Sequence, residues 1–180
     1  MLSLMQNLEP IFANDGYRPN VGIVITNQKG QVFWARRIKH DGWQFPQGGV
    51  KREETLVDAM YRELKEETGL NRDQVQVLAH TKQWLYYDLP HRFLRHQLRR
   101  ARNRPSFKGQ KQVWFLIELL EDDSVVNLKS GLDTPEFDAW RWIETDFALK
   151  NIVGFKRSVY RKALSELCQY LPCSDSPTLA

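Results

Sequence analysis

The chain is poor in cysteine and has no long hydrophobic run. Its two cysteines, Cys168 and Cys173, stand near the C-terminus without a histidine at metal-ligand spacing. We therefore expect two free thiols in the reducing cytoplasm and no disulfide framework. No segment approaches the roughly 20 apolar residues that a membrane-spanning helix needs. The N-terminus has no basic segment and carries Glu9 and Asp15, unlike a secretory signal peptide. These features predict a globular protein that does not contact a membrane.

Acidic residues are absent from one long segment. Residues 91–111 contain eight Lys or Arg and no Asp or Glu. Without these eight, the chain has 18 basic and 22 acidic residues, so its formal net charge of +4 comes from this segment alone. A localised basic segment predicts contact with a polyanion such as RNA, although a solvated basic loop without a partner would have the same composition.

Turn and helix signals suit one domain of 180 residues. Residues 1–15 are expected to form an N-terminal extension, residues 16–171 the domain and residues 172–180 a flexible tail. A turn is predicted at 27–30 and a loop with a short extended piece at 40–49. Strands are predicted at 21–26, 31–37, 75–89 and 112–120, a loop that runs into a strand at 134–143, and helices at 55–68 and 156–171. This order favours an α/β (α+β) fold with a mixed sheet between helices.

Three glutamates, Glu63, Glu66 and Glu67, lie close together in the first predicted helix. Like charges three and four residues apart destabilise a helix by roughly 0.2–0.5 kcal/mol per pair. A helical wheel places the three acids on the side of the apolar residues, which are Leu56, Ala59, Met60 and Leu64. The solvent side is occupied by Asp58, Arg62 and Lys65.

The usual explanation for an acidic cluster on a helix is a solvated face with oppositely charged partners. Here other residues already occupy that face. Burying unpaired carboxylates costs several kcal/mol, so positive charge must meet them, and one arginine cannot neutralise three acids. Ligands that offer only oxygen favour a hard divalent cation, Mg²⁺ or Mn²⁺.

The helix completes a longer pattern that begins at Gly48. Five residues separate Gly48 from Glu54, and seven more precede the rest of the pattern, which is Arg62-Glu63-Leu64, Glu66-Glu67 and Gly69-Leu70. This pattern resembles the Nudix hydrolase signature at every defined position. The resemblance implies a Nudix fold, a loop–helix–loop that binds Mg²⁺, and hydrolysis of a pyrophosphate bond in a nucleoside diphosphate linked to another group. Glu54 is expected to brace the loop–helix–loop, and Gly69 is a natural helix stop.

The same resemblance implies catalytic roles. Glu63, Glu66 and Glu67 are expected to bind two or more Mg²⁺ ions, and one of them to orient or deprotonate the attacking water; which one stays open. The carbonyl of Gly48 is expected to add a metal ligand. Arg62 is expected to orient a glutamate rather than to touch the substrate.

Segments outside this pattern resemble the bacterial RNA pyrophosphohydrolases, once described as dinucleoside polyphosphate hydrolases. The resemblance covers roughly residues 16–170, whereas residues 95–107 are longer and more basic than the family pattern. The segments that carry it are GYRPNVGIVI (16–25), WQFPQGG (43–49), GQKQVWF (109–115), TPEFDAWRW (134–142) and FKRSVYR (155–161).

This second resemblance adds residues to the site. Glu136 matches an additional metal-binding glutamate, although an ordinary loop acid would look the same. Arg18 and Arg37 match phosphate contacts, for which a guanidinium is well suited, or are surface charges. The residues that match a nucleobase cradle are Val153, Phe155 and Lys156.

Four aromatic residues have two interpretations. Trp43, Trp84, Tyr86 and Tyr87 are either core residues or platforms on which RNA bases stack. In the second case residues 91–111 would supply a basic track for RNA.

The resemblance thus implies a Mg²⁺-dependent RNA pyrophosphohydrolase that converts 5′-triphosphate or 5′-diphosphate ends to 5′-monophosphates and so initiates mRNA decay. The same chemistry on dinucleoside polyphosphates such as Ap₄A is the nearest alternative, and a small-nucleotide housecleaning enzyme is another. A non-catalytic RNA- or nucleotide-binding module would have no need for the intact glutamates. The preferred 5′ bases, protein activators and oligomeric state do not follow from the sequence.

Overall fold

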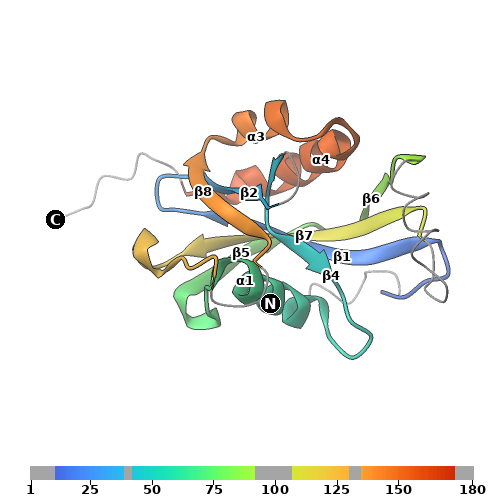
Figure 1. Cartoon of the computed structure of the whole chain (residues 1–180), viewed down its shortest axis with the longest axis horizontal. Helices are drawn as coiled ribbons and strands as arrows, with labels where there is room; N and C mark the ends of the chain where they lie inside the picture. The colour runs from blue at the N-terminus through green and yellow to red at the C-terminus, as the bar shows by residue number, and fades with distance from the viewer. Residues whose placement is uncertain (1–10, 39–41, 92–106, 130–134, 173–180) are drawn as a thin grey trace.

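The computed structural model describes residues 11–38, 42–91, 107–129 and 135–172 (Figure 1). Residues 1–10 of the expected extension, residues 173–180 of the expected tail with Cys173, and residues 92–106 of the basic segment lie outside this part of the chain. Within it, no helix combines the length and apolar character required to cross a membrane.

An eight-stranded mixed sheet forms the centre of the molecule. Its main path runs β3-β2-β1-β7-β5, while β4 pairs with β1, β6 with β7 and β8 with β2. The strands are β1 (Tyr17–Thr26), β2 (Val32–Arg37), β3 (Trp43–Gln44), β4 (Gln47–Gly49), β5 (Val75–His80), β6 (Leu85–Asp88), β7 (Gly109–Leu119) and β8 (Phe137–Ile143).

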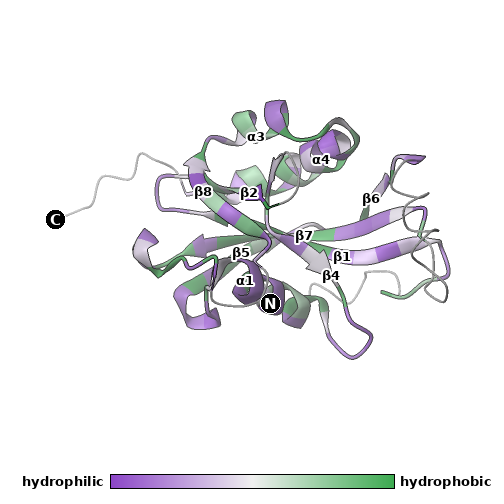
Figure 2. Ribbon diagram, viewed as in Figure 1, coloured by the Kyte–Doolittle hydropathy of each residue, from purple (hydrophilic) through white to green (hydrophobic). Residues whose placement is uncertain are grey.

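Strands β1 and β7 run parallel, from Tyr17 beside Gly109 to Thr26 beside Glu118. Their C-terminal halves are apolar and buried on both faces, as expected for central strands that helices cover. Their N-terminal ends are hydrophilic and lie together (Figure 2). The functional site forms around these polar ends.

Helix α1 (Leu56–Thr68) covers one face of the sheet, as predicted. Thr55 caps its N-terminus in a capping box with Asp58, and Gly69 ends it in the left-handed conformation at φ 78°. Its apolar side chains join the core that is formed with β1 and β7. The predicted mixed sheet between helices is confirmed: in Figure 1, α1 lies below the sheet, and α3 (Thr145–Asn151) and α4 (Arg157–Leu167) lie above it.

The second core layer lies under α4 (Arg157–Leu167). Val159, Ala163 and Leu167 are buried, as the predicted amphipathic pattern requires, and they pack with Trp34 and Trp114 of the sheet. The other helices among the described residues are α3 (Thr145–Asn151) and the short 3₁₀ turns η2 (Arg72–Gln74), η3 (Asp123–Val125), η4 (Gly154–Lys156) and η5 (Cys168–Tyr170).

The prediction of a single strand over residues 75–89 is wrong, because the chain leaves the ladder after β5 and returns as β6. At the break, the Thr81 N–H donates to the Trp114 carbonyl at 2.8 Å, and the Thr81 hydroxyl accepts from the Trp114 N–H at 3.1 Å. The Thr81 hydroxyl thus takes the place of the backbone carbonyl that a paired strand would offer to Trp114. The hydropathy of the sequence cannot reveal this replacement. Helix α3 was not predicted, and β1 and β7 begin earlier than expected.

Candidate active site

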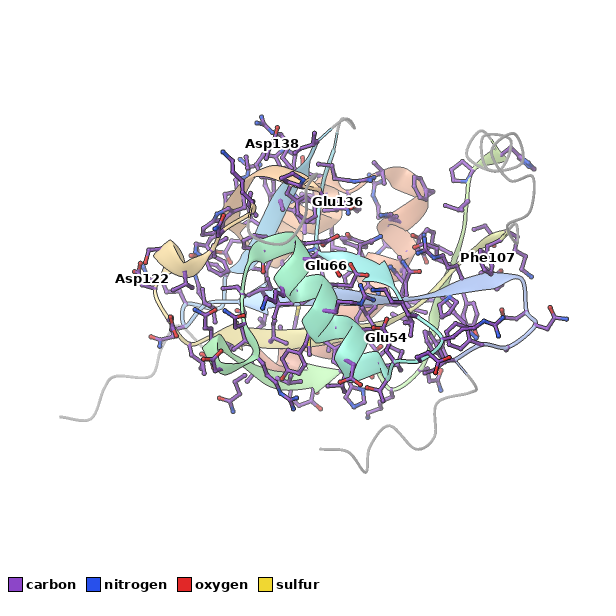
Figure 3. All side chains as sticks on the ribbon, turned by 60° about the horizontal axis from the view of Figure 1, so that its bottom comes forward. Glu54, Glu66, Phe107, Asp122, Glu136 and Asp138 are labelled. Atoms are coloured by element: carbon purple, nitrogen blue, oxygen red, sulfur yellow. The ribbon has the colours of Figure 1, made fainter. Side chains whose placement is uncertain are left out.

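A cavity of about 560 Å³ opens at the polar ends of β1 and β7, beside α1 and η4. Most of the predicted site residues line it. They are Arg18, Arg37, Gly48, Glu63, Glu67, Glu136, Val153, Phe155 and Lys156. Segments from six regions of the chain therefore converge on one site. Figure 3 shows Glu66 on α1 in the space between Glu54 and Glu136.

Arg62 organises the acids from beside the cavity. Its guanidinium donates to Glu54 at 2.6 and 2.9 Å, to Glu63 at 2.6 Å and to Glu66 at 3.3 Å, and also to the Gly49 carbonyl at 2.8 Å. The hydrogen bond from Arg62 lowers the pKa of Glu54. The prediction that Arg62 faces solvent is wrong: its side chain is only 20% exposed, because a long side chain can bend back where the wheel projects it outward.

Glu63 lies directly against the backbone of Gly48. A β-carbon built on residue 48 would overlap the carboxylate of Glu63. Gly48 thus has a packing reason to be glycine, besides any ligand role of its carbonyl. Burial raises the pKa of Glu63, and the ion pair with Arg62 opposes this rise.

Glu67 is the most deeply buried of the three acids, with 3% of its surface exposed. One carboxylate oxygen accepts the Gln47 N–H at 3.0 Å. Burial raises the pKa of Glu67 well above its ordinary value, and the nearby carboxylates of Glu136 and Glu63 raise it further. A buried acid among other acids is poorly stabilised as an anion unless a cation joins it.

Glu136 lies across the cavity from α1, on the segment that enters β8. Its carboxylate pairs with Arg37 at 3.0 Å, and both side chains are about one-third exposed. The Nε atom of Arg37 is buried without a hydrogen-bond partner among the described residues. Arg37 therefore has an unused donor as well as an acidic partner that an anionic ligand would displace.

Lys156 is a buried residue in the lining of the cavity. Its ammonium donates to Gln44 at 2.9 Å and to Gln47 at 3.2 Å. Burial, assisted by the nearby charge of Arg37, lowers the pKa of Lys156 to about 7. The protonation of a lysine with such a pKa responds to the charge of whatever occupies the cavity, and so does the number of hydrogen bonds that it can donate.

The four aromatic residues divide into two pairs. Trp43 and Tyr87 line the cavity, and the Tyr87 ring packs beside Phe155 with centroids 6.0 Å apart. Trp84 is buried at the edge of the α1-side core, and Tyr86 is 41% exposed outside the cavity.

Several side-chain amides that line the cavity were not identified from the sequence. Besides Gln44 and Gln47, the cavity is lined by Asn20 and Gln110, which hydrogen-bond to each other at 3.1 Å, while the Tyr87 hydroxyl donates to Gln110. The sequence does show these amides within or beside predicted strands. Their spacing, however, does not distinguish an amide that binds a ligand from one that packs inside the protein.

The comparisons with known proteins agree with this geometry. The NUDIX domain model matches residues 16–163. The chain belongs to the Nudix hydrolase family. Among solved structures, a dihydroneopterin triphosphate pyrophosphohydrolase from E. coli superimposes with a TM-score of 0.63 at 20% identity, over 81% of this chain and 95% of that one. An Ap₄A hydrolase from C. elegans gives 0.58 at 21% identity, over 85% and 99%. At these identities the structures establish the Nudix fold alone.

More similar sequences share one name, RNA pyrophosphohydrolase. The protein from Pseudomonas putida is 52% identical over 161 residues, which cover 89% of this chain and 98% of the relative. The protein from Hydrogenovibrio crunogenus is 50% identical over 157 residues, covering 87% and 92%. The protein from Stenotrophomonas maltophilia is 55% identical over 153 residues, covering 85% and 71%.

Nudix hydrolases generally use a divalent metal, and the residues of this site fit one. The donors gathered here are carboxylate oxygens, and the anionic form of Glu67 has a single N–H as its hydrogen-bond partner among the described residues. In the described part of the chain, no three His, Cys, Asp or Glu side chains form a ready-made metal cluster. Arg62 holds Glu63 and Glu66, and Arg37 holds Glu136. For the acids to share a cation, the ion pair of Arg37 with Glu136 must open, whereas Arg62 bonds one carboxylate oxygen of Glu63 and one of Glu66 and can keep both in place.

Proposed function

We propose that this Nudix hydrolase is an RNA pyrophosphohydrolase that uses Mg²⁺. It converts 5′-triphosphate or 5′-diphosphate ends of RNA to 5′-monophosphates, a step that initiates mRNA decay in the cytoplasm. The observation that carries this proposal is the approximately 50% identity, over nearly the whole chain, to proteins named RNA pyrophosphohydrolase. The cavity supports the proposal because its lining combines acids, arginines and the three residues proposed to contact a nucleobase, Val153, Phe155 and Lys156.

Two arginines, Arg18 and Arg37, bind the phosphates of the substrate. Arg18 extends its guanidinium over Gly49, where a β-carbon would collide with it, and Arg37 offers a buried donor that has no partner among the described residues. Guanidinium groups bind phosphate oxygens in a bidentate manner. A phosphate that takes Arg37 releases Glu136 from its ion pair, so substrate binding frees a carboxylate at the site of reaction.

Hydrolysis adds water across a phosphoanhydride bond, so the water must lose a proton while a phosphate or pyrophosphate leaves. Glu63, Glu66, Glu67 and Glu136, with the Gly48 carbonyl, would hold the divalent cation, which when bound offsets phosphate charge and makes water more acidic. One of the glutamates accepts the proton of the attacking water. Arg62 fixes the orientation of Glu63 and Glu66.

The other end of the cavity receives a nucleobase. Phe155 offers a half-buried ring, Val153 an exposed apolar contact, and Lys156 a donor held by two glutamines. Stacking and base-edge hydrogen bonds of this kind are typical of RNA end recognition. A site with phosphate contacts alone would not require this wall.

A substrate panel tests the proposal. The values of kcat/KM are compared for 5′-triphosphate RNA, Ap₄A and simple nucleoside triphosphates, all with Mg²⁺. We expect 5′-triphosphate RNA to be preferred and 5′-monophosphate RNA to accumulate. Preference for Ap₄A would assign the chain to dinucleoside polyphosphates. Absence of hydrolysis for every substrate would leave a non-catalytic binding module.

A further inference from the structure

A second groove, of about 610 Å³, lies outside the active-site cavity, between β6 and α4. Its strand side is formed by residues 83–86. Its helix side is formed by Arg161, Lys162, Ser165 and Glu166. β6 pairs with β7 and contacts α4, and the groove lies where this strand meets the helix.

Two contacts align α4 along β6 and join the groove to the cavity. At the cavity end, Phe155 packs beside Tyr87, and both residues line the cavity. At the far end, a carboxylate oxygen of Glu166 accepts the Lys82 N–H at 2.7 Å. Between these contacts, Lys162 lies five residues beyond Arg157, the first residue of α4, which is about 8 Å along the helix. On the strand side, the cavity and the groove have consecutive lining residues, Tyr87 and Tyr86.

The charge of the groove suits a polyanion. Arg161 and Lys162 are exposed, and Arg157 is exposed one turn before them, whereas α4 has no acid before Glu166. The carboxylate of Glu166 is already engaged by a backbone N–H. On the strand side, Tyr86 is 41% exposed, but its ring contacts Tyr17 edge-on, on the face of β6 opposite the buried Tyr87. The groove therefore relies on its basic side chains, which are typical of a surface that follows a nucleic-acid backbone.

We propose that this groove binds the nucleotides of single-stranded RNA that follow the reacting 5′ end. The inference rests on the proposed action on RNA 5′ ends. The first nucleotides occupy the cavity up to Phe155 and Tyr87, and the chain continues past them into the groove. Arg161 and Lys162 bind its phosphates. The groove thus distinguishes an RNA from a mononucleotide or a dinucleoside polyphosphate, which ends within the cavity.

Product binding tests this groove without requiring hydrolysis. Fluorescence anisotropy measures the affinity of the full chain for 5′-monophosphate RNAs of two and eight nucleotides. The double variant Arg161→Glu/Lys162→Glu is compared with Lys29→Glu/Lys129→Glu, which reverses two exposed charges elsewhere on the surface. We expect the groove variant to lose at least about tenfold in affinity for the longer RNA, with no change for the shorter one. Its slope of log affinity against log salt should become shallower by about 0.7 for each phosphate that the variant no longer neutralises.

Equal affinity of the groove variant and the control for the longer RNA would overturn the inference, as would an equal loss for both lengths. If the charge reversal disturbs folding, as judged by circular dichroism, Arg161→Gln/Lys162→Gln replaces it with the same expected pattern. Failure of the proposed function would look different. Wild-type protein would then leave 5′-triphosphate RNA uncleaved, while the length dependence of product binding would still report on the groove.

Discussion

The carboxylate of Glu63 lies where a β-carbon of residue 48 would be. Gly48→Ala should therefore push Glu63 out of place and lower kcat/KM by about 100-fold, the usual effect of shifting a catalytic group by about 1 Å. Gly154→Ala is the matched control, because a β-carbon there has no atom within 4 Å. Steady-state kinetics on 5′-triphosphate RNA measures both variants. Equal activity of the two would show that Glu63 need not hold this position.

Arg62 is expected to act by positioning acids rather than by supplying charge alone. Arg62→Lys keeps the charge, but a lysine ammonium has only three donors and cannot reproduce the five hydrogen bonds that the guanidinium makes to Glu54, Glu63, Glu66 and the Gly49 carbonyl. We expect the affinity for Mg²⁺ to fall by about 10- to 100-fold and the free energy of unfolding to fall by about 1–3 kcal/mol.

The exposed pair of Arg36 with Asp138 provides the control for Arg62. Arg36→Lys should change the free energy of unfolding by less than about 1 kcal/mol, because exposed ion pairs contribute little. Chemical denaturation measures stability, and calorimetric titration measures metal affinity. Metal binding that is unaffected in Arg62→Lys would contradict the positioning role.

Binding of a divalent cation should release protons from the acid cluster. The pKa of Glu67 is raised by burial and by the neighbouring carboxylates of Glu136 and Glu63, so the metal-free folded protein retains a proton there above about pH 4.5, where a free glutamate loses it. A bound cation favours the anion and expels that proton. The apparent affinity for Mg²⁺ should therefore rise with pH.

Titration calorimetry in two buffers with different ionisation enthalpies measures this proton release. The observed enthalpies of Mg²⁺ binding should differ between the buffers for the wild-type protein and differ less for Glu67→Gln. Identical enthalpies in both buffers for the wild-type protein would mean that Glu67 is already ionised before the metal binds.

Lys156 should make stability rise with pH. Burial lowers its pKa to about 7 in the folded protein, whereas in the unfolded chain it is about 10.4. Between these values the unfolded chain binds more protons, so the free energy of unfolding increases with pH by up to about 1.4 kcal/mol per unit. Denaturation of wild-type protein and Lys156→Met between pH 7 and pH 10 should show profiles that diverge, with Lys29→Met following the wild type. Parallel profiles for wild-type protein and Lys156→Met would contradict the lowered pKa.

The sequence predicted best where local signals agree. Helix α1 has a capping threonine, an uninterrupted run of helix formers and a terminal Gly69, and its bounds follow from them. The break at Thr81 could not be predicted, because it depends on a hydroxyl that meets Trp114 from a distant strand. Helix α3 is too short for a periodic signal.

The site also contains residues that could be predicted from the sequence and residues that could not. The acids and arginines could be found because a spaced motif and family resemblance mark them, and the cavity does gather Arg18, Arg37, Glu63 and Glu67. The inward turn of Arg62 could not be found, because a helical wheel records the direction of the β-carbon and not the path of a long side chain. The amides that hold Lys156 depend on contacts between residues more than 100 positions apart.

The most direct test of the central claim compares wild-type protein with Glu67→Gln on 5′-triphosphate RNA at saturating Mg²⁺, with pyrophosphate and 5′-monophosphate RNA quantified together. The substitution keeps the size of the side chain and removes a buried charge, so thermal stability should be similar. We expect the wild-type protein to release both products and Glu67→Gln to lose about 10²- to 10⁴-fold in rate. Turnover that Glu67→Gln retains at the wild-type rate would contradict catalysis by this acid cluster.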